Sequence, residues 1–257
     1  LYTAPSDEAL IYDIQTMKNL GFNMIRKHVK VETARWYYHC DRLGMIVWQD
    51  MVNGGTYNAP FMTWLPALFP KFKLHTSDRI HPLFGRKNVH GREEFIRECK
   101  ETVTALKAFP CISTWVIFNE GWGQFDSKKL TTLFRELDDT RLIDSASGWF
   151  DRRQGDFKSE HNYFAKQFVI PSDRAFVISE YGGYTCQVKG HTCSGKTYGY
   201  KICSSQEEFQ AAYHKLMSEE IEPLKEQGLC GAVYTQLSDI EDEINGLMTY
   251  DREVCKL

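Results

Sequence analysis

The stretch Leu43-Gly44-Met45-Ile46-Val47-Trp48 decides the fold, because a single glycine in it joins an amphipathic segment to a short apolar run. A glycine directly after a helix takes the left-handed conformation at little cost. The apolar run has the length and character of a strand buried on both faces, as in a parallel sheet. The stretch therefore predicts a helix over about residues 31–42 and a parallel strand at 45–48.

The same pattern recurs along the chain. Ser6 before an acidic turn is a helix N-cap signal, and the helix it begins ends at Leu20-Gly21, before a strand at 22–26. Seven strands alternating with helices, with no low-complexity linker, favour an α/β fold of the (β/α)8 TIM barrel type in a single domain, 1–257. The remaining predicted helices are 91–109, 127–137 and 205–227, and the remaining predicted strands are 111–118, 142–143, 161–164, 176–178 and 231–237.

Composition and charge exclude several classes of protein. The net charge of −3 gives no phosphate-binding surface, so nucleic acid is not an expected partner. No apolar run approaches the roughly 18 residues that span a bilayer, so no membrane partner is expected. The chain begins without Met or a recognisable targeting signal, so its compartment stays unknown.

The eight cysteines have no CxxC spacing, and we expect free thiols. Three of them (Cys186, Cys193 and Cys203) share a polar loop and could instead pair or bind a metal. Four others lie in segments that we expect to be buried: Cys40, Cys99, Cys111 and Cys230. His161 and His191 show no HxH or HExxH spacing, so neither a catalytic metal nor another cofactor is expected.

Two carboxylates stand out, because each directly ends a strongly apolar strand. Glu120 follows Trp115-Val-Ile-Phe-Asn119, and Glu180 follows Phe176-Val-Ile-Ser179. Catalytic groups of barrels lie at the C-terminal ends of strands. Two carboxylates facing one pocket suit glycoside hydrolysis, in which one donates a proton to the leaving oxygen and the other attacks the anomeric carbon. A structural reading of both as salt-bridge partners is the alternative.

Further strand-end residues are candidates for sugar binding. Asp50 either braces Arg26 or touches the sugar. Arg26 could alternatively brace the barrel interior, and His28 could cap a loop. The other polar candidates are His161 and Gln236. Aromatic residues just past strand ends offer sugar-stacking faces or belong to the core: Trp48, Trp122, Trp149, Tyr163 and Tyr181.

Three segments resemble the catalytic barrel of glycoside hydrolase family 2. Trp115-Val-Ile-Phe-Asn119-Glu120-Gly121-Trp122 is similar to its acid/base segment, in which an Asn-Glu pair ends strand 4. Val177-Ile-Ser-Glu180-Tyr-Gly-Gly183 resembles the segment whose Glu ends strand 7 as the nucleophile. Phe22-Asn-Met-Ile-Arg26-Lys-His28 is similar to the strand-2 segment, whose Arg and His line the sugar pocket.

The resemblance implies a retaining, exo-acting β-glycosidase with Glu120 as general acid/base and Glu180 as nucleophile. It implies that Asn119 bonds the sugar 2-hydroxyl and that Tyr163 holds the nucleophile. The last strand carries Tyr234-Thr-Gln236 where members usually have a Trp-rich strand, and no Asn-x-Lys clamp for a carboxylate follows it. The β-galactosidase-like branch is therefore expected, with β-glucuronidase or β-mannosidase specificity as alternatives.

Family members carry a first strand and two β-sandwich domains before the helix that Ser6 begins. Leu1-Tyr2-Thr3-Ala4-Pro5 is too short and Pro-broken for that strand, so we expect a fragment of a longer chain. The barrel would then lack its first strand between the strands at 22–26 and 231–237. An open edge there would weaken activity of the isolated chain and invite a second copy to associate.

Two other classes of function remain open. A metal-dependent barrel hydrolase would need ligands at successive strand ends, which the histidine spacing does not supply. A non-catalytic carbohydrate-binding barrel would keep the fold without turnover, which the intact Asn119, Glu120 and Glu180 argue against. The segment 51–90, rich in Gly, Pro, Asn and aromatic residues, is too long for an idle loop and is expected to serve the site.

Overall fold

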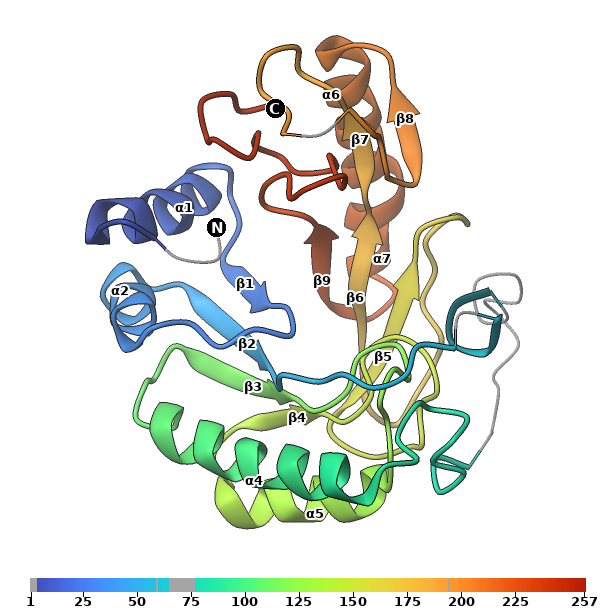
Figure 1. Ribbon diagram of the computed structural model, residues 1–257. Coiled ribbons are helices and arrows are strands. Elements are labelled where there is room, and N and C mark those ends of the chain that lie inside the picture. Colours follow the sequence, from blue (N-terminus) through green and yellow to red (C-terminus); the bar gives the residue numbers. More distant parts are fainter. Residues whose placement is uncertain (1–3, 59, 65–76, 194) are drawn as a thin grey trace. The chain divides into compact units, whose positions relative to one another are not determined.

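The computed structural model describes residues 4–58, 60–64, 77–193 and 195–257, and it divides into two compact units. The N-terminal unit is Pro5–Glu160 and the C-terminal unit is His161–Leu257. Each unit contains a sheet with helices packed beside it (Figure 1).

The N-terminal unit is built on a four-stranded parallel sheet of order β1-β2-β3-β4. Its strands run in chain order, with Arg26 opposite Trp48 and Asp50 opposite Val116 in register. Because the strands are parallel, their C-terminal ends lie along one edge, which brings the polar residues after them together. The strand bounds are Met24–Lys27, Ile46–Asp50, Ile112–Val116 and Leu142–Asp144.

Among the described residues of this unit, four α-helices accompany the sheet, and several of their ends follow the sequence signals. Helix α1 (Asp7–Asn19) begins at Ser6, whose hydroxyl accepts from the Ala9 N–H at 3.4 Å. Helix α2 (Ala34–Leu43) ends at Gly44, which adopts φ 66°. Helices α4 (Val89–Leu106) and α5 (Ser127–Leu137) lie side by side (Figure 1).

The core of this unit lies between sheet and helices. Helix α4 buries the one face that the sequence predicts: Phe95, Cys99, Val103 and Leu106. Phe95 stacks on Phe118 with the ring centroids 5.4 Å apart. Trp115 in β3 is fully buried, and its indole N–H donates to Asp138 at 3.0 Å, which satisfies the polar end of the ring.

The C-terminal unit centres on β6 (Ala175–Gly182), which pairs in parallel with β9 (Leu229–Thr235). The sheet order is β5-β6-β9, and β5 (Phe157–Asn162) ends in this unit. A helical segment packs beside them: α6 (Gln206–Lys215), the π-helical η2 (Leu216–Ile221) and α7 (Glu222–Lys225).

A second, two-stranded sheet in this unit was not expected from the sequence. Strand β7 (Tyr184–Cys186) pairs in parallel with β8 (Lys201–Cys203), with Cys186 opposite Cys203. The sequence suggests a polar loop here, but the first and last residues of this segment pair with each other as two short strands. We call residues 184–203 the β7–β8 excursion.

The seven predicted strands are all present in the described residues, and the pairs β1–β2, β2–β3, β3–β4 and β6–β9 are parallel, as predicted. The bounds differ in places. Helix α2 begins at Ala34 rather than near residue 31, because Thr33 is its N-cap. The helix expected at 205–227 changes to π-helical hydrogen bonding at Leu216. The expected absence of a first strand falls mostly on residues 1–3, which lie outside the described residues.

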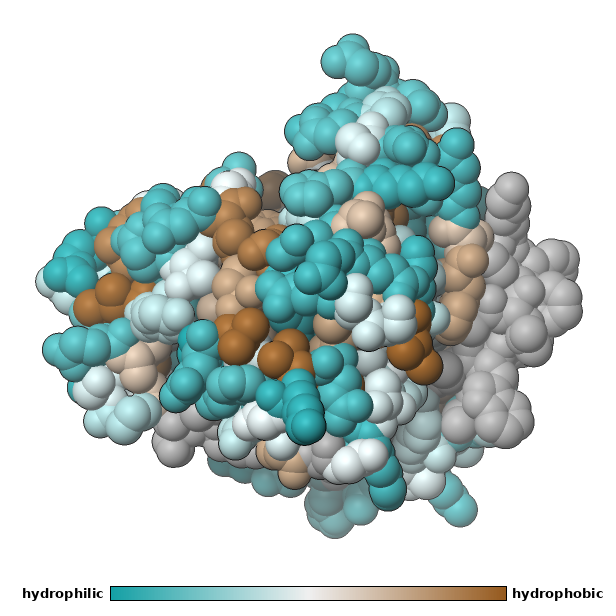
Figure 2. Space-filling model, turned by 90° about the horizontal axis from the view of Figure 1, so that it is seen from above, coloured by the Kyte–Doolittle hydropathy of each residue, from teal (hydrophilic) through white to brown (hydrophobic). Residues whose placement is uncertain are grey.

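All eight cysteines lie in the described part of the chain, and each is a free thiol. The expectation that Cys230 is buried is wrong, because β9 turns this side chain to solvent. Cys111 is half-buried, whereas Cys186 and Cys203 are buried. On the face seen in Figure 2, hydrophobic residues form small separate patches among hydrophilic ones. No described helix is both long and apolar enough to cross a membrane.

Candidate active site

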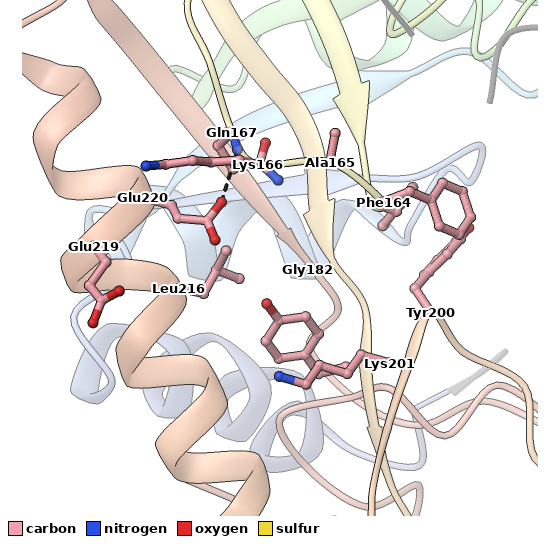
Figure 3. A pocket seen from close by; sticks show the side chains of 12 residues that line it. Phe164, Ala165, Lys166, Gln167, Gly182, Tyr200, Lys201, Leu216, Glu219 and Glu220 are labelled. Atoms are coloured by element: carbon pink, nitrogen blue, oxygen red, sulfur yellow. Dashed lines mark hydrogen bonds between the residues drawn. The ribbon is translucent and has the colours of Figure 1, made fainter. Parts of the chain in front are cut away.

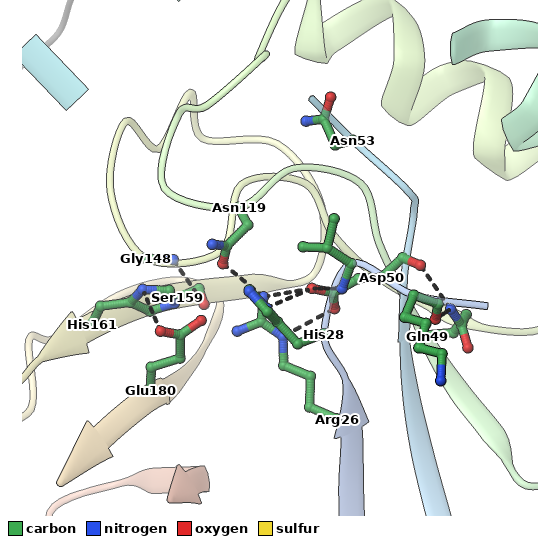
Figure 4. Close-up of polar contacts among 12 residues, drawn as sticks. Arg26, His28, Gln49, Asp50, Asn53, Asn119, Gly148, Ser159, His161 and Glu180 are labelled. Carbon is green, nitrogen blue, oxygen red and sulfur yellow. Dashed lines mark hydrogen bonds and ion pairs between the residues drawn. The ribbon is translucent and has the colours of Figure 1, made fainter. Parts of the chain in front are cut away.

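The N-terminal unit gathers three predicted residues into one network at the ends of β1, β2 and β3. The Arg26 guanidinium donates to both carboxylate oxygens of Asp50, at 2.9 and 2.8 Å. The same side chain donates to the Asn119 side-chain oxygen at 2.8 Å (Figure 4). The side chains of Arg26 and Asp50 are each about 2% exposed, so both charges are removed from water. The two parallel hydrogen bonds between them offset the free-energy cost of this desolvation.

Asp50 therefore braces Arg26, one of the two roles that the sequence left open. Burial by itself would raise the pKa of Asp50, but the neighbouring Arg26 charge and a hydrogen bond from His28 outweigh it and lower that pKa. His28 Nδ1 lies 3.4 Å from Asp50, and its side chain is 58% exposed. The Val29 N–H also donates to Asp50 at 3.3 Å. His28 thus keeps one ring edge on the network and the other toward solvent.

Glu120 is held by its backbone. It adopts φ 53°, a left-handed conformation that non-glycine residues rarely take, and Gly121 follows at φ 73°. The Glu120 N–H donates to the Ser147 carbonyl at 3.0 Å. The Trp122 N–H donates to the Asn119 carbonyl at 3.0 Å, and this hydrogen bond closes a turn. Such strained positions cluster at functional sites, where the surrounding structure fixes them. The turn reverses the chain directly after β3 and places the carboxylate at the strand end.

The aromatic candidates divide into core and site residues. Trp48 stacks on Phe157 at 5.0 Å and is buried, and Tyr181 is 1% exposed, so both belong to the core. Trp122 and Trp149 pack against a cluster of Met62, Phe84 and Phe150. The Trp122 indole N–H donates to the Gly55 carbonyl at 3.1 Å. The segment expected to serve the site therefore supports Trp122 through its described residues.

In the C-terminal unit, two side chains at the end of β5 contact Glu180, and one of them also contacts Thr235 of β9. The Tyr163 hydroxyl donates to Glu180 Oε2 at 2.5 Å and lies 3.0 Å from the Thr235 hydroxyl. His161 Nδ1 is 3.4 Å from the same carboxylate oxygen, and its side chain is fully buried (Figure 4). Glu180 is 14% exposed. Hydrogen bonds to a carboxylate favour its charged form, so this arrangement suits an ionised group poised in one orientation.

Gln236 lies just after β9, where its amide donates to Asn245 at 2.7 Å. Asp239, another strand-end residue, pairs instead with the fully buried Lys256 at 2.7 Å. Burial raises the pKa of Asp239 against the opposing effect of Lys256. Asp239 thus has a structural partner, whereas Gln236 stays available as a binding candidate.

The structure thus brings together Arg26, His28, Asp50 and Asn119 in one unit and His161, Tyr163 and Glu180 in the other. Sequence reasoning missed Thr235, although it directly precedes Gln236 at a strand end and could have been found there. It also missed Tyr200, whose ring stacks on Tyr163. That contact left no sequence signal, because it joins an irregular loop to a distant strand end.

Parallel strands with carboxylates at their C-terminal ends, each oriented by neighbouring polar groups, define the class of α/β-barrel glycosidases. Residues 4–255 match the family described as "Glycosyl hydrolases family 2, TIM barrel domain". The chain belongs to this family and is its catalytic barrel domain.

Relatives in sequence carry the name beta-galactosidase. One from Priestia megaterium is 24% identical over 213 residues, covering 75% of this chain and 17% of that protein. One from Streptococcus thermophilus is 24% identical over 144 residues, covering 54% of this chain and 12% of that protein. The chain thus spans a small part of the length of these relatives.

Solved structures of family 2 enzymes share the fold. An FMN-binding beta-glucuronidase described as from Facaelibacterium prausnitzii matches with a TM-score of 0.67 at 21% identity, over 97% of this chain and 39% of that one. A beta-galacturonidase from Eisenbergiella tayi matches with a TM-score of 0.65 at 17% identity, over 98% and 48%. These matches confirm the predicted α/β barrel type over nearly the whole chain.

Proposed function

We propose that this chain hydrolyses O-linked β-glycosides with retention of configuration, using Glu120 as general acid/base and Glu180 as nucleophile. The observation that supports this best is the environment of Glu180. A strand-end carboxylate that accepts a 2.5 Å hydrogen bond from Tyr163 and has His161 beside it is held as an oriented anion. An oriented anion is what attack on an anomeric carbon requires.

The reaction proceeds in two displacements. Glu180 attacks the anomeric carbon while Glu120 gives its proton to the glycosidic oxygen, so the bond to the aglycone breaks and a glycosyl ester forms. Glu120, now ionised, takes a proton from water, and the water oxygen attacks the same carbon. The ester bond breaks, Glu180 leaves as a carboxylate, and the sugar departs with its original configuration.

Asn119 is the proposed partner of the sugar 2-hydroxyl. Its side-chain oxygen accepts from Arg26, which fixes the amide so that the NH₂ group points the other way and can donate. Arg26 in turn is fixed by Asp50. The network therefore orients a sugar-binding group next to the acid/base in sequence. His28, His161, Trp122 and Gln236 are the further residues that we propose to line the sugar site.

The proposed substrate is a β-galactoside, taken in an exo-acting manner. The sequence relatives named beta-galactosidase and the absence of an Asn-x-Lys motif after the last strand support this choice. The test is release of nitrophenol from β-galactoside, β-glucuronide, β-mannoside and β-glucoside substrates, each with and without a chelator. Chelator-insensitive release fastest from the galactoside supports the proposal.

A different preferred sugar would overturn the substrate but keep the mechanism. Chelator-sensitive release would instead favour a metal-dependent hydrolase, and no release from any substrate a carbohydrate-binding barrel. The assay includes both this chain and a longer protein that carries it. Equal activity of the two would contradict the expectation that the isolated barrel is weakened at an open edge.

The mechanism also predicts a distance. Retaining enzymes hold their two carboxyl groups about 5–5.5 Å apart, whereas inverting enzymes leave room for a water at about 6.5–9.5 Å. We expect the shorter separation between Glu120 and Glu180 in a crystal structure of the active protein. A separation near 9 Å with both groups ordered would contradict retention.

A further inference from the structure

The ring of Tyr163 has an unusual neighbour. Tyr200 stacks on it with the ring centroids 3.7 Å apart and the planes 7° from parallel. Tyr200 comes from the β7–β8 excursion, directly before β8, whereas Tyr163 directly follows β5. The edge of the Tyr200 ring also contacts Phe164, with centroids 5.3 Å apart. Two segments far apart in the sequence therefore meet through stacked rings.

Core packing does not enclose these rings. Tyr163, Phe164, Tyr184 and Tyr200 all line a pocket of about 470 Å³ in the C-terminal unit (Figure 3). A phenol ring beside an open pocket can rotate about its side-chain bonds unless something fixes its face. The stack on Tyr200 is the contact that restricts the Tyr163 ring on that side.

The backbone makes room for Tyr200 at Gly183. Gly183 has φ 64°, its carbonyl accepts from the Tyr200 N–H at 3.1 Å, and a Cβ there would overlap the Tyr200 ring. A Cβ at Gly199 would overlap the Thr185 side chain. A side chain at Gly183 would therefore displace the Tyr200 ring, whereas one at Gly199, the residue before Tyr200, would displace Thr185. The contact at Gly183 is an observation separate from the ring stacking, and it shows that the backbone on this side leaves room for the Tyr200 ring.

We propose that Tyr200 is a positioning residue, which acts through Tyr163 to hold the nucleophile Glu180 in its reactive orientation. This inference rests on the proposed role of Glu180. The Tyr163 hydroxyl lies between Glu180 and Thr235, at 2.5 and 3.0 Å. Rotation of the ring would carry the hydroxyl away from both.

The test compares kcat and KM for an aryl β-glycoside in Tyr200→Ala, Tyr200→Phe and the control Ile202→Ala. Ile202 lies in β8, two residues after Tyr200, and is 69% exposed. An aromatic pair contributes about 0.5–1.5 kcal/mol, so Tyr200→Ala should lower kcat about two- to tenfold with KM little changed. Tyr200→Phe keeps the stacked ring and should restore kcat, and Ile202→Ala should match the unmodified protein. A wild-type kcat in Tyr200→Ala overturns the proposal.

A double-mutant cycle separates positioning from a general loss of structure. Once Tyr163→Phe has removed the hydroxyl, Tyr200→Ala should lower kcat no further, because nothing is left to position. Fully additive losses would overturn the proposal, as would an equal fall in kcat in Tyr200→Phe. Loss of the stacked ring should lower the melting temperature of Tyr200→Ala slightly, so the kinetics of all variants are compared at a temperature at which each is fully folded.

The failure of the proposed function would look different. A 2-fluoro glycoside of the preferred sugar should form a stable ester on Glu180 in the unmodified protein, visible as a mass increase on the peptide that contains it. If the unmodified protein neither forms the ester nor turns over any glycoside, the proposed function fails. If it does both and the Tyr200 variants behave identically, only the inference about Tyr200 fails.

Discussion

The two strand-end carboxylates are held by different means. Glu120 lies in a left-handed turn after β3, and its backbone N–H donates to the Ser147 carbonyl. Glu180 lies near the end of β6, where the register against β9 shifts, and the side chains of His161 and Tyr163 contact its carboxylate. A general acid/base must reach both a leaving oxygen and a water, whereas a nucleophile must hold one line of attack. The difference suits the two proposed roles.

The sharpest test of the comparison removes the nucleophile. Glu180→Ala should lower kcat on the order of 10⁴-fold or more for every aryl glycoside, because no glycosyl ester can form. The measurement is nitrophenol release from substrates that span a wide range of leaving-group pKa. Retention of more than a few per cent of activity with any of them would show that another group attacks.

Removing the acid/base should give a graded loss. Glu120→Ala should cost about 10²–10⁴-fold with poor leaving groups and far less with good ones, which need little protonation. Azide, which needs no general base, should accelerate the variant with good leaving groups and form a glycosyl azide. If the losses in the Glu120 and Glu180 variants were the same with every leaving group, the two roles would be misassigned.

A smaller effect should follow from loosening the nucleophile alone. Tyr163→Phe removes a hydrogen bond to a charged group, which contributes about 1.5–3 kcal/mol, so kcat should fall roughly ten- to 100-fold. Thr235→Val removes only the second partner of the Tyr163 hydroxyl and should cost less. A larger loss of kcat in the Thr235 variant than in the Tyr163 variant would contradict this assignment, because Thr235 would then matter to Glu180 by a route other than the Tyr163 hydroxyl.

The network behind Asn119 should matter for stability. Arg26→Ala leaves Asp50 buried without its partner, which should reduce the free energy of unfolding by about 3–5 kcal/mol. Arg35→Ala is the matched control, because it breaks an exposed pair with Asp7 and should cost about 1 kcal/mol or less. Urea unfolding of the two variants at neutral pH measures both. Equal costs would mean that burial does not distinguish the pairs.

This loss should also depend on pH. The folded state lowers the pKa of Asp50, so its contribution to stability is complete above its unfolded pKa of about 3.9. The contribution disappears as the pH falls through the lower, folded pKa. The difference in unfolding free energy between the unmodified protein and Arg26→Ala should therefore shrink in acid. A difference that stays constant from neutral pH to below pH 3 would contradict the origin assigned to it.

The sequence was informative where local signals and periodicity agree. Ser6 and Gly44 mark helix ends because capping depends on adjacent residues alone. Glu120 and Glu180 stand out because a charge directly after an apolar strand is costly unless it has a task. The parallel sheet follows from the repeated alternation of helix and strand.

Features set by contacts between distant segments were not predictable. Strands β7 and β8 have three residues each, and their pairing joins ends separated by a polar loop. The role of Asp50 stayed open in the sequence because bracing Arg26 depends on register between strands. The exposure of Cys230 depends on how β9 sits at the margin of its sheet, which periodicity does not reveal.

The pairing of β7 with β8 at the two ends of the β7–β8 excursion bears on how this enzyme could be redesigned. Pairing of Tyr184 with Lys201 and of Cys186 with Cys203 fixes both ends of the segment 187–196, independently of its length. Loop-closure entropy grows only logarithmically, so doubling such a segment costs about 0.6 kcal/mol. Peptides could be inserted there without moving Tyr200, provided that residues 198–203 are kept. The excursion thus offers a place to lengthen the chain between two paired strands, the second of which begins directly after Tyr200.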